Sequence, residues 1–206
     1  MQIAGKETLM KTKGFTLIEL AVVLAIIAIL AAILTPMVTN YLEQARVARA
    51  QADLRTIADA VKLYQRDTGR YPIYDSSAAY GTDTASKADF ATGSGSTPAD
   101  GSGGSSWVLG TEVATTSLEL YLNNNYSGVV VSSFPKATFS GPYIAAIDSD
   151  PWGNKYLLTA GNLSKGSTNH AFVISAGPDG TLQTGRDVAA TANFAASGDD
   201  IIAVIK

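Results

Sequence analysis

A single carboxylate lies inside a long apolar segment near the N-terminus. The run Phe15–Leu34 is 20 residues long and contains one charged residue, Glu19. About 20 apolar residues are enough to cross the hydrocarbon core of a bilayer as a helix. A carboxylate in such a segment costs about 2.5 kcal/mol or more. We therefore expect Glu19 to have a cationic partner within the membrane.

The residues before this segment indicate where the cation comes from. Lys13 and Gly14 join a basic leader to the apolar run, which begins at Phe15. If the chain were cut after Gly14, Phe15 would carry a new positively charged amine four residues before Glu19. The amine and the carboxylate could pair within one chain, or between neighbouring subunits stacked in register.

Two simpler explanations of the same segment fit less well. An ordinary cleaved secretory signal would use Lys11 and Lys13 as its basic region. Its apolar core would then be too long, would contain an acid, and would lack a small-x-small cut followed by a polar start. A plain single-pass anchor is the other alternative, and it would leave the carboxylate of Glu19 without a purpose.

The run from Gly14 to Leu20, Gly-Phe-Thr-Leu-Ile-Glu-Leu, resembles the class III signal of type IV pilins and of the pseudopilins of type II secretion. The resemblance implies that a prepilin peptidase cuts after Gly14 and methylates the new N-terminal Phe15. It also implies that Glu19 directs subunits into a filament. Pro36 falls where many of these proteins place a helix-kinking proline, and a proline inside a helix is expected to bend it.

Chain length and composition limit the classes of function. The chain has 206 residues, no cysteine and a net charge of −3. The leader carries three lysines and one glutamate, so the mature chain would carry −5 and offer no basic surface to a nucleic acid. Disulfides, thiol catalysis and thiolate metal sites are excluded. The positive leader predicts a cytoplasmic N-terminus and an exported head.

The chain divides into three predicted parts. Residues 1–14 form the leader, residues 15–67 a long helix whose segment 15–35 crosses the membrane, and residues 68–206 a periplasmic or extracellular head. Thr68-Gly69 supplies the helix stop. The second half of the helix carries an apolar stripe at helical spacing, which predicts packing against the head. The stripe comprises Leu54, Ile57, Ala58, Val61 and Tyr64.

The head is predicted to complete an α+β, type IV pilin-like fold, with the long N-terminal helix packed on a small antiparallel sheet. Residues 75–106 include a glycine- and serine-rich run and are predicted to be a flexible loop. A short helix is predicted at 116–122 and a strand at 129–131. Three further strands, at 155–159, 171–175 and 201–205, would form the sheet on the apolar helix face.

The head also carries a series of short motifs that resemble the major pseudopilin of type II secretion. Their order fits across nearly all of the chain apart from 73–140. The motifs are Asp67-Thr68-Gly69-Arg70-Tyr71-Pro72, Gly141-Pro142-Tyr143, Asp150-Pro151-Trp152-Gly153-Asn154-Lys155-Tyr156, Ser175-Ala176-Gly177-Pro178-Asp179-Gly180 and Gly198-Asp199-Asp200-Ile201.

This resemblance implies a non-enzymatic subunit of a type II secretion pseudopilus, a filament that drives protein export across the outer membrane. The subunit would sit in the inner membrane with its head in the periplasm. Its partners would be further copies of itself, the prepilin peptidase, an inner-membrane assembly platform, minor pseudopilins and membrane lipid, with no nucleic acid. An alternative is a type IV pilus subunit for adhesion, motility or DNA uptake. A membrane-tethered enzyme or binding module would need convergent polar groups in a pocket, and the sequence offers no such constellation.

Four aspartates near the C-terminus are candidate ligands for a metal ion. Asp179, Asp187, Asp199 and Asp200 lie among glycines, and hard oxygen ligands in that setting are what Ca²⁺ prefers. The adjacent carboxylates of Asp199 and Asp200 repel each other unless a cation is present. Solvated turn aspartates are the alternative.

The family resemblance adds to this metal prediction. It implies that Asp179 and the Asp199-Asp200 pair bind calcium, with oxygens near Ser175 and Ala176 completing the shell. One departure is the stretch from Thr181 to Gly198, which is longer than the resemblance implies. The position of Asp187 relative to the other three is therefore open.

Overall fold

The computed structural model describes residues 14–69, 71–72, 89–102, 107, 118–124, 139–163, 166–190 and 193–206. Two of the expected features, the leader at 1–13 and the strand at 129–131, lie outside these residues. The chain separates into two compact units, Met1–Gln44 and Ala45–Lys206.

One helix, α1, runs through both units from Leu17 to Thr68 and is 52 residues long. The expected helix at 15–67 is therefore confirmed, with each end displaced by one or two residues. Its stop also lies where the sequence indicates. Gly69 has φ of 73°, and its N–H donates to the carbonyl of Gln65 at 2.8 Å. Left-handed backbone with such a bond is a usual way for a helix to end, and glycine adopts it without steric cost.

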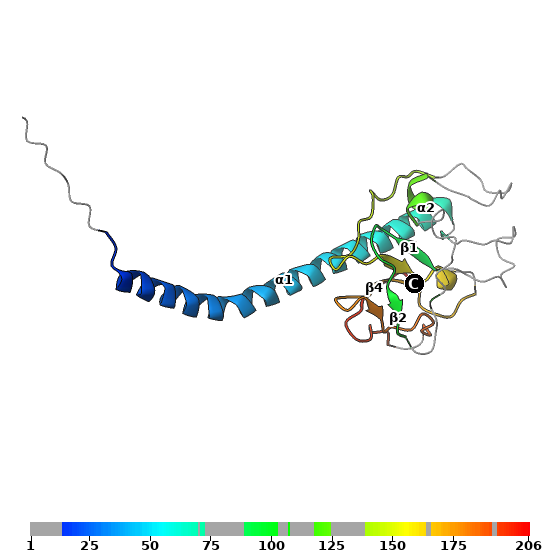
Figure 1. The fold of residues 1–206 in the computed structure, drawn as a ribbon. Coiled ribbons are helices and arrows are strands. Elements are labelled where there is room, and N and C mark those ends of the chain that lie inside the picture. Colours follow the sequence, from blue (N-terminus) through cyan, green and yellow to red (C-terminus); the bar gives the residue numbers. More distant parts are fainter. Residues whose placement is uncertain are drawn as a thin grey trace, which may run out of the picture. The chain divides into compact units, whose positions relative to one another are not determined.

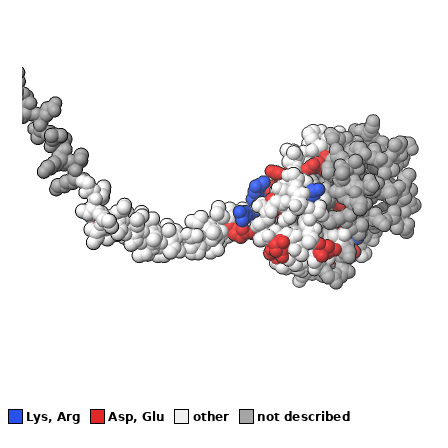
Figure 2. Space-filling view, in the orientation of Figure 1, with Lys and Arg blue, Asp and Glu red and all other residues white. Residues whose placement is uncertain are grey.

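The first unit is an isolated apolar helix. Its large apolar side chains, from Phe15 to Leu42, are all exposed in the single chain. On the face that Figure 2 shows, this part of the helix is almost entirely white, whereas charged side chains lie on the same face of the second unit. By length and composition α1 can cross a membrane. A helix that is apolar on all sides needs lipid or neighbouring helices around it.

The larger sheet of the second unit has four antiparallel strands in the order β1-β3-β4-β6, with β1 at Phe90–Thr92. Figure 1 labels two of these strands, β1 and β4. β3 covers Tyr156–Leu158, β4 covers Phe172–Ser175 and β6 covers Ile201–Val204. These strands confirm the three expected from the sequence. A 3₁₀ helix at Ala160–Leu163 lies between β3 and β4, where the sequence indicates a turn.

The prediction of a flexible loop over 75–106 is wrong for part of this range. Within it lie β1, at Phe90–Thr92, and β2, at Ala99–Asp100. β1 pairs with β3, while β2 pairs in parallel with β5 at Thr181–Leu182. Gly93 and Gly95 have positive φ and leave no room for a side chain against the backbone of 147–153. These glycines therefore permit close backbone packing, which glycine composition alone does not distinguish from flexibility.

The apolar stripe of α1 is buried, as its spacing indicates. All five of its residues belong to one hydrophobic cluster, in which Leu54 is fully buried and Ile57 is 1% exposed. The cluster also includes residues of β3 and β4 and of α2, which covers Leu118–Asn124. The short helix expected at 116–122 is thus present as α2, which ends two residues later, at Asn124. This core holds the second half of α1 on the sheet, so the α+β, pilin-like fold class is confirmed.

Leu54→Ala should lower the free energy of unfolding of the second unit by about 2–5 kcal/mol, because it leaves a cavity in a closed core. The measurement is urea unfolding of the full chain in detergent, followed by tryptophan fluorescence. Leu63→Ala is the matched control on the same helix, since Leu63 is 37% exposed. Equal losses from the two variants would contradict this description of the core.

Candidate functional site

The Glu19 carboxylate closes a reciprocal pair of contacts at the start of α1. Its Oε2 accepts hydrogen bonds from the backbone N–H and the hydroxyl of Thr16, both at 2.8 Å. In return the N–H of Glu19 donates to Thr16 Oγ1 at 3.3 Å. This arrangement is a capping box, in which a Thr and a Glu three residues apart satisfy free backbone donors at a helix start.

The sequence analysis did not assign a role to Thr16, although the spacing Thr-x-x-Glu was a visible signal for it. Glu19 thus has a neutral partner within its own chain. Phe15 is 89% exposed, and Gly14 has open space around it, so the peptide bond between them is accessible in the single chain. The pairing of Glu19 with a Phe15 amine stays a prediction, because that amine exists only after cleavage.

Two of the candidate metal ligands, Asp179 and Asp199, meet at the turn after β4. The N–H of Asp179 donates to Asp199 Oδ2 at 3.3 Å, and the N–H of Thr181 donates to Asp179 Oδ1 at 2.7 Å. Gly177 has φ of 65° and lies against the backbone carbonyl of Asp199, where a Cβ would clash. The glycine therefore allows the two acidic turns to approach each other closely.

Asp200 points into the protein, in contrast to its neighbour Asp199. It is only 7% exposed, and its Oδ2 accepts hydrogen bonds from the N–H groups of Gln183 and Thr184. Burial raises the pKa of the Asp200 carboxyl, and the charge of Asp199 adds to the effect. Its other oxygen, Oδ1, is buried without a hydrogen-bond partner. The Asp200 carboxylate is therefore only half satisfied.

Gln183, which was not predicted from the sequence as a site residue, links the buried Asp200 to the exposed Asp179. Its backbone N–H donates to Asp200 Oδ2 at 2.9 Å, while its side-chain Nε2 donates to Asp179 Oδ2 at 2.6 Å. Through Gln183, three of the four candidate aspartates belong to one hydrogen-bonded cluster.

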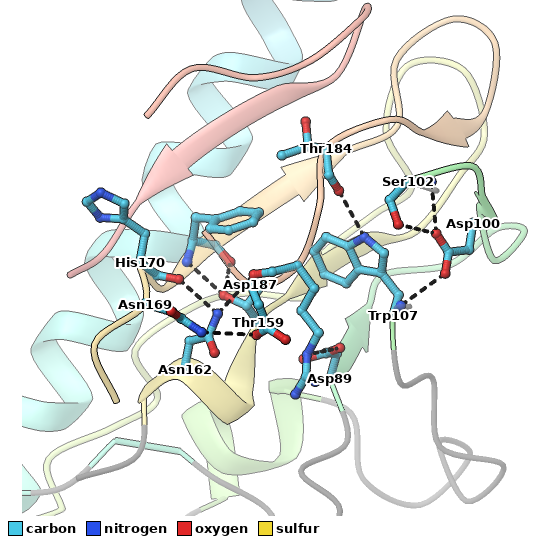
Figure 3. Close-up of polar contacts among 12 residues, drawn as sticks. Asp89, Asp100, Ser102, Trp107, Thr159, Asn162, Asn169, His170, Thr184 and Asp187 are labelled. Atoms are coloured by element: carbon cyan, nitrogen blue, oxygen red, sulfur yellow. Dashed lines mark hydrogen bonds and ion pairs between the residues drawn. The ribbon is translucent and has the colours of Figure 1, made fainter. Parts of the chain in front are cut away.

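The other two candidate ligands, Ser175 and Asp187, lie outside this hydrogen-bonded cluster. Ser175 is fully buried, and its hydroxyl donates to Asp150 Oδ2 at 2.7 Å, so its side chain is committed to a structural contact. Asp187 accepts a hydrogen bond from Asn169 Nδ2 at 3.3 Å (Figure 3). Because Asn169 precedes β4 and Asp179 follows it, the structure brings Asp187 to the opposite end of that strand. Asp187 is thus not brought to the other three aspartates.

The acidic cluster offers oxygen atoms but no complete set of side-chain ligands. Among the described residues, no group of three or more His, Cys, Asp or Glu side chains is arranged to hold a metal ion. Calcium takes six to eight oxygens, including backbone and amide carbonyls, so a set of carboxylates is not required. The unpartnered Oδ1 of Asp200 and the all-oxygen character of the cluster fit a hard cation.

The stretch from Thr181 to Gly198 is held against the sheet by other contacts (Figure 3). Arg186 forms an ion pair with Asp89 at 2.9 Å, and these side chains are 13% and 0% exposed. The side-chain amide of Asn162 donates to the carbonyls of His170 and Arg186, both at 3.0 Å. The indole N–H of Trp107 donates to the carbonyl of Thr184 at 3.2 Å. This stretch is therefore an integral part of the head.

Asp89→Ala should destabilise the second unit by about 3–5 kcal/mol, because it removes the carboxylate that lies 2.9 Å from the buried Arg186 guanidinium. Arg186→Ala should have a similar effect, and the double variant should cost less than the two single changes together. Urea unfolding of the full chain measures all three.

The exposed pair of Asp59 and Lys62, separated by 4.0 Å, is the control for this ion pair. Its removal should cost less than about 1 kcal/mol. Additive losses for Asp89 and Arg186 would show that their contact contributes nothing specific.

Comparison with known proteins finds two family models that match the N-terminal half of the chain. The model of the prokaryotic N-terminal methylation motif matches residues 9–35, and that of type II secretion system protein G matches residues 37–98. Similar curated proteins include type II secretion system core protein G of Klebsiella pneumoniae, 25% identical over 86% of this chain and 93% of that protein. The same-named protein of Escherichia coli K12 is 28% identical over 86% and 90%.

A further relative is similar over a shorter stretch. The type IV major fimbrial protein FimA of Dichelobacter nodosus is 43% identical over 60 residues, which are 28% of this chain and 38% of that protein. No solved structure matches the chain. The chain therefore has a pilin-like α+β fold, an N-terminal segment that matches the methylation motif, and similarity over most of its length to the core protein G of type II secretion systems.

Proposed function

We propose that this chain is a structural subunit of a type II secretion pseudopilus, which polymerises to drive protein export across the outer membrane. The observation that carries the proposal is the joining of an N-terminal methylation motif to a helix segment with exposed apolar side chains, in a chain similar to core protein G over 86% of its length. A helix exposed on all sides requires an environment of lipid before assembly and of other helices after it. The role is structural, and no enzymatic step is assigned to the chain.

Assembly would begin in the inner membrane, with a cytoplasmic N-terminus and a periplasmic head. A prepilin peptidase cuts after Gly14 and methylates Phe15, whose new amine becomes available to a carboxylate. Glu19, held by Thr16 in the single chain, then exchanges this neutral partner for the amine of an adjacent subunit. The exchange brings opposite charges together in a medium of low dielectric constant, where their attraction is strong. The assembly platform and minor pseudopilins would receive the subunit at this stage.

Glu19→Gln should leave the protein inserted and cleaved but should abolish filament assembly, because the amide cannot form an ion pair with the amine. The measurement is shearing and immunoblotting for filaments, combined with membrane fractionation and a cleavage assay. Glu43→Gln, on the same helix beyond the apolar segment, is the control and should assemble normally. Normal filaments from Glu19→Gln would refute the pairing role.

A type IV pilus subunit is the second candidate, because the type IV major fimbrial protein FimA is 43% identical over 60 residues. That similarity covers only 28% of this chain, whereas the similarity to core protein G covers 86%. Deletion of the gene distinguishes the two candidates. Loss of exoprotein secretion supports the pseudopilus, whereas intact secretion with loss of extracellular fibres supports the pilus.

We also propose that the head binds one calcium ion at Asp179, Asp199 and Asp200. The support is the hydrogen-bonded cluster of these three residues around Gln183, together with the buried and unpartnered Asp200 Oδ1. None of the three aspartates forms an ion pair with a Lys or Arg in the part of the chain that the structure describes. A bound cation would offset their mutual repulsion and fix the turn after β4 to the start of β6.

Calcium should raise the melting temperature of the full chain in detergent, and a chelator should reverse the effect. At 100 times the dissociation constant the stabilisation is about 2.7 kcal/mol. Asp199→Ala/Asp200→Ala should lose the calcium response. The control is Asp59→Ala, an exposed aspartate on α1, which should retain it. If calcium leaves the melting temperature of the wild-type chain unchanged, the three residues are ordinary solvated turn aspartates and the calcium proposal is wrong.

A further inference from the structure

Two buried oxygen atoms without partners lie on residues that contact each other. Among the described residues, Gln183 Oε1 and Asp200 Oδ1 are both closed off from solvent and accept no hydrogen bond. Gln183 and Asp200 are themselves joined by the backbone bond from Gln183 N to Asp200 Oδ2. A buried acceptor without a donor is costly, and its presence calls for an unrecorded water or ion.

The Gln183 side chain is held in a defined position. Its Nε2 donates to Asp179 Oδ2 at 2.6 Å, which leaves Oε1 as the atom that faces away from that carboxylate. Gly198 provides the space on the other side, since a Cβ there would lie 2.8 Å from Gln183 Cδ and Oε1. The glycine just before Asp199 thus makes room for the amide oxygen within the acidic cluster.

The surroundings favour a cation over a water molecule at this place. Three aspartates belong to the cluster, and one of them, Asp200, is only 7% exposed. Within the described residues no Lys or Arg forms an ion pair with any of the three. Calcium accepts amide oxygens together with carboxylates. Among the described residues no group of three or more His, Cys, Asp or Glu side chains is arranged to hold a metal ion, so a calcium ion here would have to take neutral oxygens as well.

We propose that the side-chain carbonyl of Gln183 is a ligand of the calcium ion, supplied by the stretch between β5 and β6. The inference rests on the calcium binding proposed above and adds to it a residue that the acidic motif does not contain. In this arrangement Gln183 Oε1 and Asp200 Oδ1 become satisfied by the same ion. The amide also keeps its Nε2 bond to Asp179 and so orients a second ligand.

The test compares Gln183→Leu with Gln183→Glu in the full chain, purified in detergent and freed of calcium. Calcium is titrated by calorimetry, and the calcium-induced shift of the melting temperature is recorded in parallel. Gln183→Leu removes the ligand oxygen and should weaken calcium binding about 10-fold or more. Gln183→Glu keeps an oxygen at that place and adds a negative charge, so it should bind calcium at least as tightly as wild type.

The pair of variants separates a ligand from a structural residue. Both lose the Nε2 donor to Asp179, so a merely structural role predicts that both weaken calcium binding. That result, or wild-type binding in Gln183→Leu, would overturn the inference while leaving the calcium site intact. Absence of calcium binding by wild type would overturn the calcium proposal itself. Gln51→Leu, an exposed glutamine on α1, is the control for the substitution.

Discussion

The whole structure depends on one helix that must satisfy two different environments. Over residues 20–34 α1 carries only apolar side chains, on every side, whereas in the second unit it buries a stripe of apolar residues. The first pattern suits lipid or other helices, and the second suits a sheet. The change of pattern, more than any single contact, separates the part of the chain that can enter a membrane from the part that folds on itself. The apolar stripe packs against β3 and β4 and so holds the four-stranded sheet on the second half of α1.

Sequence patterns predicted the elements whose signals are local. The helix, its end at Gly69 and the stripe follow from periodicity and from a glycine with positive φ. The strands β3, β4 and β6 are short runs of apolar residues between turns. β1 and β2 were not predicted from the sequence, because they are only three and two residues long and lie near glycines. Their existence depends on partners in β3 and β5 that are distant in sequence, and a local pattern contains no information about such pairing.

The candidate sites divide in the same way. Glu19 was predictable because a carboxylate in an apolar segment is costly, and its cap on Thr16 was readable from a spacing of three residues. Asp187 was grouped with the other aspartates by closeness in sequence, but a strand separates them in space. Gln183 could not be predicted, since its place depends on the absence of a side chain at Gly198 and on a contact with Asp200, 17 residues away.

A head without cysteines needs other means to fix its C-terminal part, and here two means of different character act on one stretch of chain. The Arg186–Asp89 ion pair is buried and needs no added ligand. Among the described residues Asp200 Oδ1 is buried without a hydrogen-bond partner, and burial raises the pKa of this carboxyl, so on its own Asp200 weakens the fold at neutral pH. If calcium binds as proposed, the stretch between β5 and β6 combines the Arg186–Asp89 ion pair with an attachment at Gln183 and Asp200 whose strength depends on the ion.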